Sequence, residues 1–248
     1  MHIASLFSGI GGLELGLEAA IPGAEVKVQV ELDPYARGVL AKHWPEARRF
    51  DDIRTVRASD LQGVSLICGG FPCQDLSVAG KGAGLDGERS GLWEEFARLV
   101  REVRPRFIVV ENVPALRWRG LGRVLGDLAS AGYDAEWESR SAASVGAWHK
   151  RERLFIIAYP DAESREGEAK APHPLRPRLE GQQQPSGAKE KHATARDSRR
   201  WAAEPKLGRV AYGIPGRVDR LRCLGNAVVP QVAYRIGLRV RELVEQGY

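Results

Sequence analysis

Cysteine is scarce in this chain. Only three cysteines occur among its 248 residues: Cys68, Cys73 and Cys223. An odd, sparse set does not form the disulfide framework of a small secreted protein, and it suits a reducing cytoplasm better. Cys68 and Cys73 also lack the second pair of Cys or His residues that zinc needs, so we expect no metal site.

Long apolar runs are missing as well. No stretch approaches eighteen consecutive apolar residues, which argues against a membrane-spanning helix. The initial stretch MHIASLFSGIGG has neither a basic segment nor a cleavage pattern, so we expect no signal peptide. Hydrophobic residues still make up 43% of the chain, which is enough for the core of one large domain.

The net charge of +5 is unevenly spread along the chain. Residues 161–222 hold 14 Lys and Arg against 9 Asp and Glu, residues 1–160 hold 20 against 21, and residues 223–248 hold 3 against 2. The whole excess therefore falls in one stretch of the second half. Such a stretch is either a solvated loop or a segment that faces a polyanion, and charge alone does not separate the two.

Strand-like and helix-like segments alternate along the first 160 residues. Apolar runs predict strands at residues 2–7, 25–31, 64–70, 106–113, 135–141 and 153–159, and amphipathic stretches predict helices at residues 11–20, 33–44, 91–103 and 120–132. Asp33 is expected to cap its helix, with Pro34 in the first turn. This alternation predicts a doubly wound, mostly parallel α/β sheet that is covered on both faces.

The composition changes after residue 160. Residues 161–200 are rich in Pro, Gln, Gly and charged residues but nearly lack large apolar ones, so we expect a flexible insert there. Order is expected to resume near Trp201, and residues 229–246 predict a final helix. The predicted organisation is an α/β domain over residues 1–160, a short basic region over residues 161–222, and a segment over residues 223–248 that returns to the first domain.

Glycines mark the first strand-to-helix turn, in LFSGIGG. Glycine lets backbone amides approach a ligand there, although the spacing matches no phosphate-binding loop and the turn alone could be purely structural. Glu31 ends the next strand, where such folds bind a ribose diol. Asp52 and Ile53 follow the third strand region, where an acid beside an aliphatic side chain suits an adenine. Together these residues favour a nucleoside-containing cofactor.

Cys73 differs from the other cysteines. Cysteine is commonly a buried small hydrophobe, and Cys68 inside SLICGG fits that description. Cys73 instead follows Pro72 beyond the strand end, at the edge where ligands bind, so a lowered thiol pKa would make it a nucleophile. Five glycines from Gly80 to Gly91 follow, and they favour a lid over a substrate, with a plain disordered loop as the alternative.

Glu111 ends another strand, in VVENVPAL, at the same predicted sheet edge as Cys73. Burial there would raise its pKa and suit a general acid, whereas the alternative is a cap for the following turn. Arg151 and Arg153 precede the last strand at period two, so they share one face. They could hold an anionic or carbonyl-rich group, or they could simply face solvent.

An ordered series of motifs resembles the cytosine-C5 DNA methyltransferase family. FSGIGG resembles the family's first cofactor motif, Glu31 the second and DDI the third. GGFPCQ resembles the catalytic Pro-Cys motif, ENV the acid motif, KRER the Arg-x-Arg motif, and LGNAVVP the last motif, which folds back to the cofactor site. The series runs from Phe7 to Pro230, and motifs in this order are far more specific together than singly.

The resemblance implies a DNA (cytosine-5) methyltransferase of bacterial or phage type that uses S-adenosyl-L-methionine. Cys73 would add to C6 of a flipped-out cytosine and Glu111 would hydrogen-bond or protonate N3. Arg153, with Arg151 nearby, would contact the base carbonyl or support the thiolate. The implied cofactor contacts are Phe7, Gly9, Gly11, Gly12, Glu31, Asp52, Ile53, Leu92, Asn226 and Val228, and the residues implied at the base pocket and closing loop are Pro72, Gln74 and Ser77.

The chain departs from the family pattern in two places. Trp148 and His149 stand where the family usually has Pro-Gln before the Arg-x-Arg motif. The target-recognition region is short and over half of it is of low complexity, so readout would rest on few contacts. The candidates for those contacts are Trp201, Arg209, Arg217 and Arg220, with phosphate contact the commoner role for arginine there.

The implied partner is double-stranded DNA, and a cognate restriction endonuclease is a further candidate partner. We expect a monomer without membrane contact, in the cytoplasm of a bacterial or phage-infected cell near the nucleoid. Two alternatives remain: a tRNA cytosine-5 methyltransferase, because a near relative of the family methylates RNA, and a catalytically idle DNA-binding relative. The presence of Cys73, Glu111 and Arg153 together disfavours the idle relative.

Overall fold

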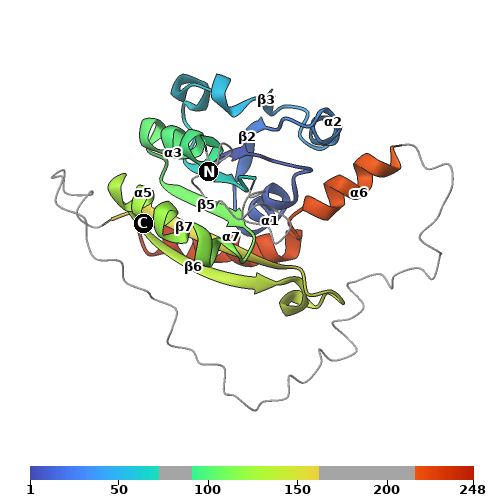
Figure 1. Ribbon diagram of the computed structural model, residues 1–248. Coiled ribbons are helices and arrows are strands. Elements are labelled where there is room, and N and C mark those ends of the chain that lie inside the picture. The colour runs from blue at the N-terminus through green and yellow to red at the C-terminus, as the bar shows by residue number, and fades with distance from the viewer. Residues whose placement is uncertain (73–90, 162–215) are drawn as a thin grey trace, which may run out of the picture.

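The computed structural model describes residues 1–72, 91–161 and 216–248 (Figure 1). In these ranges seven strands form one sheet: β1 (His2–Leu6), β2 (Glu25–Val30), β3 (Arg48–Phe50), β4 (Leu66–Gly69), β5 (Phe107–Asn112), β6 (Tyr133–Ser141) and β7 (Glu152–Pro160). The strand order is β3-β2-β1-β4-β5-β7-β6. The first five strands run parallel, and β7 lies antiparallel between β5 and β6.

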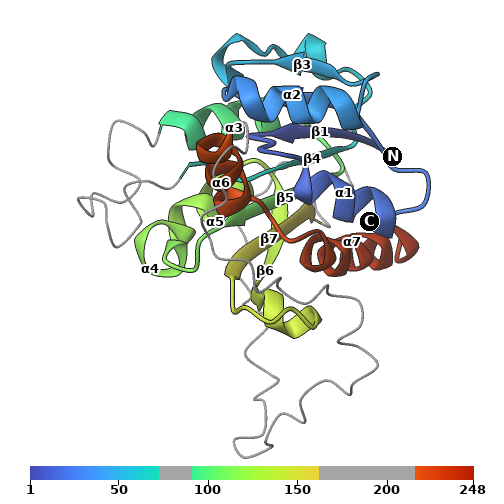
Figure 2. The ribbon, with the colours of Figure 1, turned by 90° about the vertical axis from the view of Figure 1, so that its right-hand side faces the viewer.

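Helices cover both faces of the sheet (Figures 1 and 2). On one face, α1 (Gly12–Ala20) and α7 (Pro230–Glu245) share a core cluster with apolar side chains of β1, β4 and β5. On the other face, α3 (Gly91–Val103) and α5 (Leu121–Ser130) belong to a second cluster. The other helices of the described residues are α2 (Pro34–His43), α4 (Leu116–Arg119), α6 (Arg217–Asn226), η1 (Ile53–Thr55), η2 (Ala58–Leu61) and η4 (Ala142–Val145). The predicted doubly wound, mostly parallel α/β fold is confirmed.

Local sequence explains where the helices begin. Asp33 caps α2 as predicted, because its carboxylate accepts hydrogen bonds from the backbone N–H groups of Tyr35 (2.8 Å) and Ala36 (3.1 Å). Pro34 occupies the first turn of this helix, where its missing N–H costs nothing. α3 has the bounds that its amphipathic pattern predicts, residues 91–103.

The last helix of the chain lies beside the first (Figure 2). Glycines make the approach close, because a Cβ on Gly16 would lie 2.4 Å from the Cβ of Ala233. A Cβ on Gly237 would likewise lie 2.6 Å from the Cβ of Ala20. The C-terminal helix is therefore fixed against the helix that follows β1. Across the described ranges, no helix is long and apolar enough to cross a membrane.

Candidate active site

Most candidate site residues gather at one edge of the sheet. β1, β2, β4 and β5 run parallel, so their carboxyl ends lie together. The antiparallel β7 begins at that same edge, where Leu154 pairs with Asn112. Ligands of such sheets bind outside the carboxyl ends of the strands.

The turn after β1 has an unusual backbone. Phe7, Gly9 and Gly11 have positive φ angles of 58°, 57° and 85°. This conformation is ordinary for glycine but costs about 1–3 kcal/mol at a residue such as Phe7. Strain of this kind tends to persist at binding sites. A Cβ placed on Gly9 would meet no atom of the described residues within 4 Å, so they leave room for a ligand at this point of the turn.

Glu31 holds this turn from the end of β2. One carboxylate oxygen accepts the N–H of Gly9 (2.7 Å), and the other accepts the N–H of Asp33 (2.8 Å). The acid that we expected at a ribose therefore also orders the glycine turn and the start of α2. Each carboxylate oxygen has a second lone pair, so hydroxyl groups can still donate to it.

Gly11 and Gly12 have packing roles in the same turn. A Cβ on Gly11 would lie 2.3 Å from the ring of Trp44, and a Cβ on Gly12 would lie 2.3 Å from the carbonyl oxygen of Val228. A residue with a side chain would clash at both positions, so glycine lets the segment before α7 touch the turn. Asn226, at the end of α6, is exposed.

A second group of candidate cofactor residues lies at η1 and in the first turn of α3. Ile53 is 2% exposed and belongs to the core, whereas Asp52 and Leu92 are partly exposed. Leu92 packs against the core cluster that holds Ile53, and Asp52 caps η1 by accepting the N–H of Arg54 (3.0 Å). Together with Glu31, Asp52 offers a carboxylate for hydroxyl or amino groups and Leu92 offers aliphatic surface for a base, which fits a nucleoside.

Glu111 and Arg153 form a largely buried ion pair. Nε of Arg153 donates to Oε1 of Glu111 over 2.8 Å. The side chain of Arg153 is 20% exposed and that of Glu111 is 11% exposed. Burial raises the pKa of Glu111 and outweighs the charges of Arg153 and Arg151, which act in the opposite direction. A carboxyl group with a raised pKa, held by a fixed guanidinium, is suited to share a proton with a substrate.

Gly70 and Asn112 support this pair, and neither was assigned a role from the sequence. A Cβ on Gly70 would lie 2.5 Å from Oε2 of Glu111, so glycine leaves the space that the carboxylate occupies. Nδ2 of Asn112 donates to the carbonyl oxygen of Phe71 (3.2 Å), and its Oδ1 accepts the N–H of Val113 (2.8 Å). Asn112 therefore ties the end of β5 to the chain just before Pro72. The sequence offered one signal for these two roles, the position of each residue: Gly70 directly follows β4, and Asn112 ends β5.

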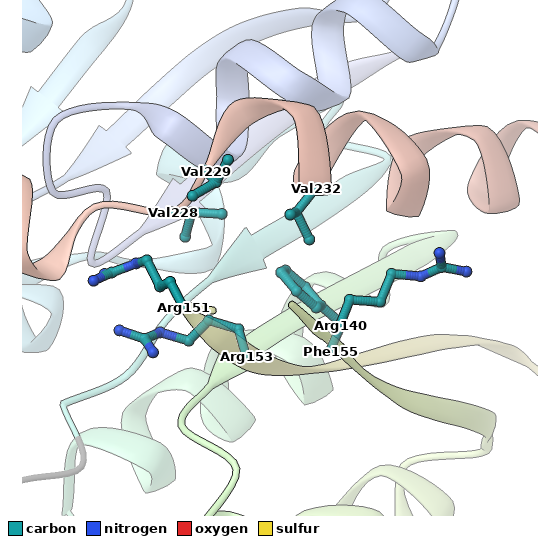
Figure 3. Close-up of a pocket in the computed structure, with 7 residues that line it drawn as sticks. All are labelled: Arg140, Arg151, Arg153, Phe155, Val228, Val229 and Val232. Atoms are coloured by element: carbon teal, nitrogen blue, oxygen red, sulfur yellow. The ribbon is translucent and has the colours of Figure 1, made fainter. Parts of the chain in front are cut away.

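Arg151 turns toward the C-terminal segment. Its Nη1 donates to the carbonyl oxygen of Gly225 (2.6 Å), whereas its Nε and Nη2 are buried without a hydrogen-bond partner among the described residues. Burial and the nearby charge of Arg153 lower its pKa. The narrow hollow in Figure 3 is lined by Arg140, Arg151, Arg153, Phe155, Val228, Val229 and Val232. It has no room for a ligand, so it is a packing seam between β7 and the last segment.

Some predicted residues fall outside the described ranges. These are Cys73, Gln74, Ser77 and Arg209, together with Trp201, residues 80–90 of the predicted lid and residues 162–200 of the predicted insert. Pro72 is described and is exposed. Arg217 and Arg220 are exposed on α6, which projects from the body (Figure 1) and is anchored to the start of α2 by an ion pair between Arg222 and Asp33.

Known proteins resemble this chain over much of its length. The model of the C-5 cytosine-specific DNA methylase family matches residues 1–207. The type II methyltransferase M2.BsuMI of Bacillus subtilis (strain 168) is 38% identical over 166 residues, which cover 64% of this chain and 42% of that protein. The type II methyltransferase M.HhaI of Haemophilus parahaemolyticus is 31% identical over 163 residues, with coverage of 64% and 49%.

A solved structure has the same fold. It is a prophage-encoded protein of E. coli, described provisionally as a DNA modification methyltransferase, with a TM-score of 0.55 and 29% identity. The match covers 71% of this chain and 52% of that one. The chain thus spans about half the length of the relatives it matches.

Proposed function

Because the chain belongs to the C-5 cytosine-specific DNA methylase family, we propose that it is a DNA (cytosine-5) methyltransferase that takes its methyl group from S-adenosyl-L-methionine. The observation that carries the proposal is the largely buried pair of Glu111 and Arg153. This pair lies next to Gly70. It also lies at the end of β5, where Asn112 donates a hydrogen bond to the carbonyl oxygen of Phe71 and so holds the segment that precedes Cys73. Addition to a cytosine ring requires an acid and a nucleophile, and here an acid with a raised pKa lies beside the segment that leads to a candidate thiol nucleophile in the sequence.

In the proposed mechanism the target cytosine first leaves the duplex, because C5 and C6 cannot be reached inside the base stack. The thiolate of Cys73 adds to C6, and the electrons of the C5–C6 double bond make C5 a nucleophile. Glu111 gives a proton or a hydrogen bond to N3 and so neutralises the charge that develops on the ring. Arg153, with Arg151 nearby, holds this acid and contacts the base carbonyl or supports the thiolate.

S-adenosyl-L-methionine, when bound, supplies the methyl group that C5 receives. Loss of the C5 proton and β-elimination of the Cys73 thiolate then restore the free enzyme. The residues proposed to hold this molecule are Phe7, Gly9, Gly11, Gly12, Glu31, Asp52, Ile53, Leu92, Asn226 and Val228. Support comes from the space that the described residues leave open at Gly9, from the Glu31 carboxylate beside it and from the partly exposed Asp52 and Leu92, which suit a ribose and an adenine.

The proposed substrate is duplex DNA in a bacterial or phage-infected cytoplasm. Pro72, Gln74 and Ser77 are assigned to the base pocket, and Arg209, Arg217 and Arg220 to the DNA. The type II methyltransferases among the relatives support this substrate and a paired restriction endonuclease. We further propose a monomer with a catalytic domain over residues 1–160, a recognition region over 161–222 and a returning segment over 223–248.

Replacement of the candidate nucleophile tests the function. Cys73→Ala is expected to abolish transfer of labelled methyl groups to duplex DNA and to retain cofactor binding. Cys223→Ser removes another free thiol, on α6, and is expected to stay active. DNA that contains 5-fluorocytosine should trap the wild-type protein covalently and leave Cys73→Ala free.

Other results would contradict the proposal. Full activity of Cys73→Ala would remove the mechanism, and transfer to tRNA but not to duplex DNA would show an RNA methyltransferase. A protein that binds cofactor and DNA but never traps fluorinated DNA would be an idle relative. Bisulfite mapping of DNA from cells that express the chain would identify the target sequence of an active enzyme.

A further inference from the structure

The helix after β5 carries an exposed tryptophan. Trp118 lies in α4 and is 74% exposed. Trp148, in the connection between β6 and β7, is 65% exposed, and these two are the only exposed tryptophans among the five in the described residues. Both lie in connections at the sheet edge that holds Glu111, Trp118 in the short helix after β5 and Trp148 between β6 and β7. Exposed aromatic surface at such an edge commonly marks a contact with a partner.

Arg117 contacts two tryptophan rings. Its guanidinium carbon lies 4.8 Å from the ring centroid of Trp118 and 5.0 Å from that of Trp137 on β6. Aromatic faces attract the cation without neutralising it, and they use none of its N–H donors. Among the described residues Arg117 makes no ion pair with a carboxylate. The rings therefore fix the position of this cation and leave its donors available to an outside acceptor.

Two stretches at this sheet edge, one of which holds Arg117, carry positive charge and no acid. Residues 113–120 include Arg117 and Arg119, and residues 141–151 include Lys150 and Arg151, while neither stretch contains Asp or Glu. Figure 2 shows α4 and α6 on the same side of the molecule, away from both chain termini. An oriented arginine that pairs with no carboxylate of the described residues, on an edge that carries other basic residues, is typical of surfaces that contact phosphate groups.

We propose that Arg117, held by Trp118 and Trp137, grips a backbone phosphate of duplex DNA beside the methylated nucleotide, with Trp118 against the adjoining sugar. The inference rests on the proposed function, because it takes duplex DNA as the substrate. A phosphate contact of this kind adds affinity without sequence readout. The region expected to recognise DNA, between Arg153 and the LGNAVVP motif, is short. A phosphate contact from Arg117 would let the catalytic domain itself hold DNA.

Salt-dependent DNA binding tests this contact in the full chain. Fluorescence anisotropy with a non-specific duplex is expected to show roughly tenfold weaker binding by Arg117→Ala, with a salt slope shallower by about one, because one phosphate contact is lost. Arg117→Lys keeps the charge but not the planar stacking, so it should keep the slope and lose affinity. Trp118→Ala should also weaken binding several-fold.

The matched control is Arg241→Ala, another surface arginine, which lies in the second half of α7 and pairs with Glu245. It should bind DNA like the wild type. Because Arg117 and Trp118 are exposed, their variants are expected to fold and to bind S-adenosyl-L-methionine normally. Thermal melts and cofactor titrations check both points.

Three outcomes separate this inference from the proposed function. In the first outcome the wild type methylates DNA, while Arg117→Ala and Trp118→Ala bind DNA with wild-type affinity and salt slope. The proposed phosphate contact is then rejected, and the proposed methyltransferase activity is kept. If methyl transfer is never seen but the Arg117 effect persists, the surface stands and the proposed activity fails. A wild-type protein that binds structured RNA in place of duplex DNA overturns both.

Discussion

At the scale of single residues, Glu14 is the least expected side chain of the fold. It lies in the first turn of α1 and is fully buried, and neither carboxylate oxygen has a hydrogen-bond partner among the described residues. Ser5 lies close to it, and Gln29 and Cys68 flank Ser5 on the neighbouring strands. Burial raises the pKa of Glu14 to about 7, and burial raises the pKa of Cys68 too, with a further contribution from the charge of Glu14.

Glu14 should make the stability of the protein fall as the pH rises. Its pKa is about 7 in the folded state against 4.5 for an ordinary glutamate, so the folded state binds more protons between these values. The stabilising contribution of Glu14 is fully present below pH 4.5, declines as the pH approaches 7 and is lost above pH 7. The total loss is roughly 3 kcal/mol of unfolding free energy.

Glu14→Gln keeps the shape of the side chain and removes this titration. Urea unfolding from pH 4.5 to 8 should give similar stabilities near pH 5 and a more stable variant at pH 8. Glu46→Gln, at an exposed position, should follow the wild type throughout. If Glu14→Gln and the wild type share one pH profile, Glu14 does not titrate in this range.

At the scale of elements, the contact of α1 with α7 depends on glycine. Alanine normally favours a helix over glycine by about 1 kcal/mol. Gly16→Ala should nevertheless destabilise the fold by about 1–3 kcal/mol, because the new Cβ would lie 2.5 Å from the carbonyl oxygen of Pro230 and α7 would have to move. Gly38→Ala is the matched control: it lies in α2, where no atom of the described residues lies within 4 Å of the new Cβ, and it should stabilise by about 0.5–1 kcal/mol. Chemical denaturation measures both, and equal stabilisation by the two variants would show that α7 adjusts freely.

Most elements could be predicted from the sequence because their patterns are local. The buried face of α3 repeats at helical spacing, and Asp33 marks the start of α2 through its own side chain. α6 had no comparable signal, since none of its residues is buried and Val218 and Leu221 are exposed. Its contacts with the body are instead made between distant residues: Arg222 pairs with Asp33, 189 positions away, and Arg151 donates a hydrogen bond to the carbonyl oxygen of Gly225.

The sequence could predict single residues of the candidate site, but it could not predict which of their side chains contact one another. Glu111 could be placed at a strand end from the apolar run before it. Its pairing with Arg153 could not, because it depends on β7 entering antiparallel between β5 and β6. The roles of Gly70 and Gly12 were hidden for the same reason: each glycine makes room for an atom of a distant segment, Glu111 in one case and Val228 in the other.

At the scale of the whole molecule, the proposed cofactor site joins segments from both ends of the chain. The turn at Gly9 is held by Glu31 from β2, and Val228 reaches the same turn from the segment before α7. None of these groups would be close together in an unfolded chain. A molecule that binds here must therefore stabilise the folded state as a whole.

S-adenosyl-L-methionine is accordingly expected to raise the melting temperature. At a hundred times its Kd it should add about 2.7 kcal/mol, or roughly 5–10 °C for a chain of this size. Glu31→Ala should lose most of this shift, because the carboxylate proposed to hold the ribose is gone. Exposed Glu25→Ala, at the other end of β2, should keep the shift. The comparison uses the ligand-induced shift and not the melting temperature itself, since Glu31→Ala also removes two hydrogen bonds of the free protein. A full shift in Glu31→Ala, or none in the wild type, would mean that the turn after β1 does not bind this cofactor.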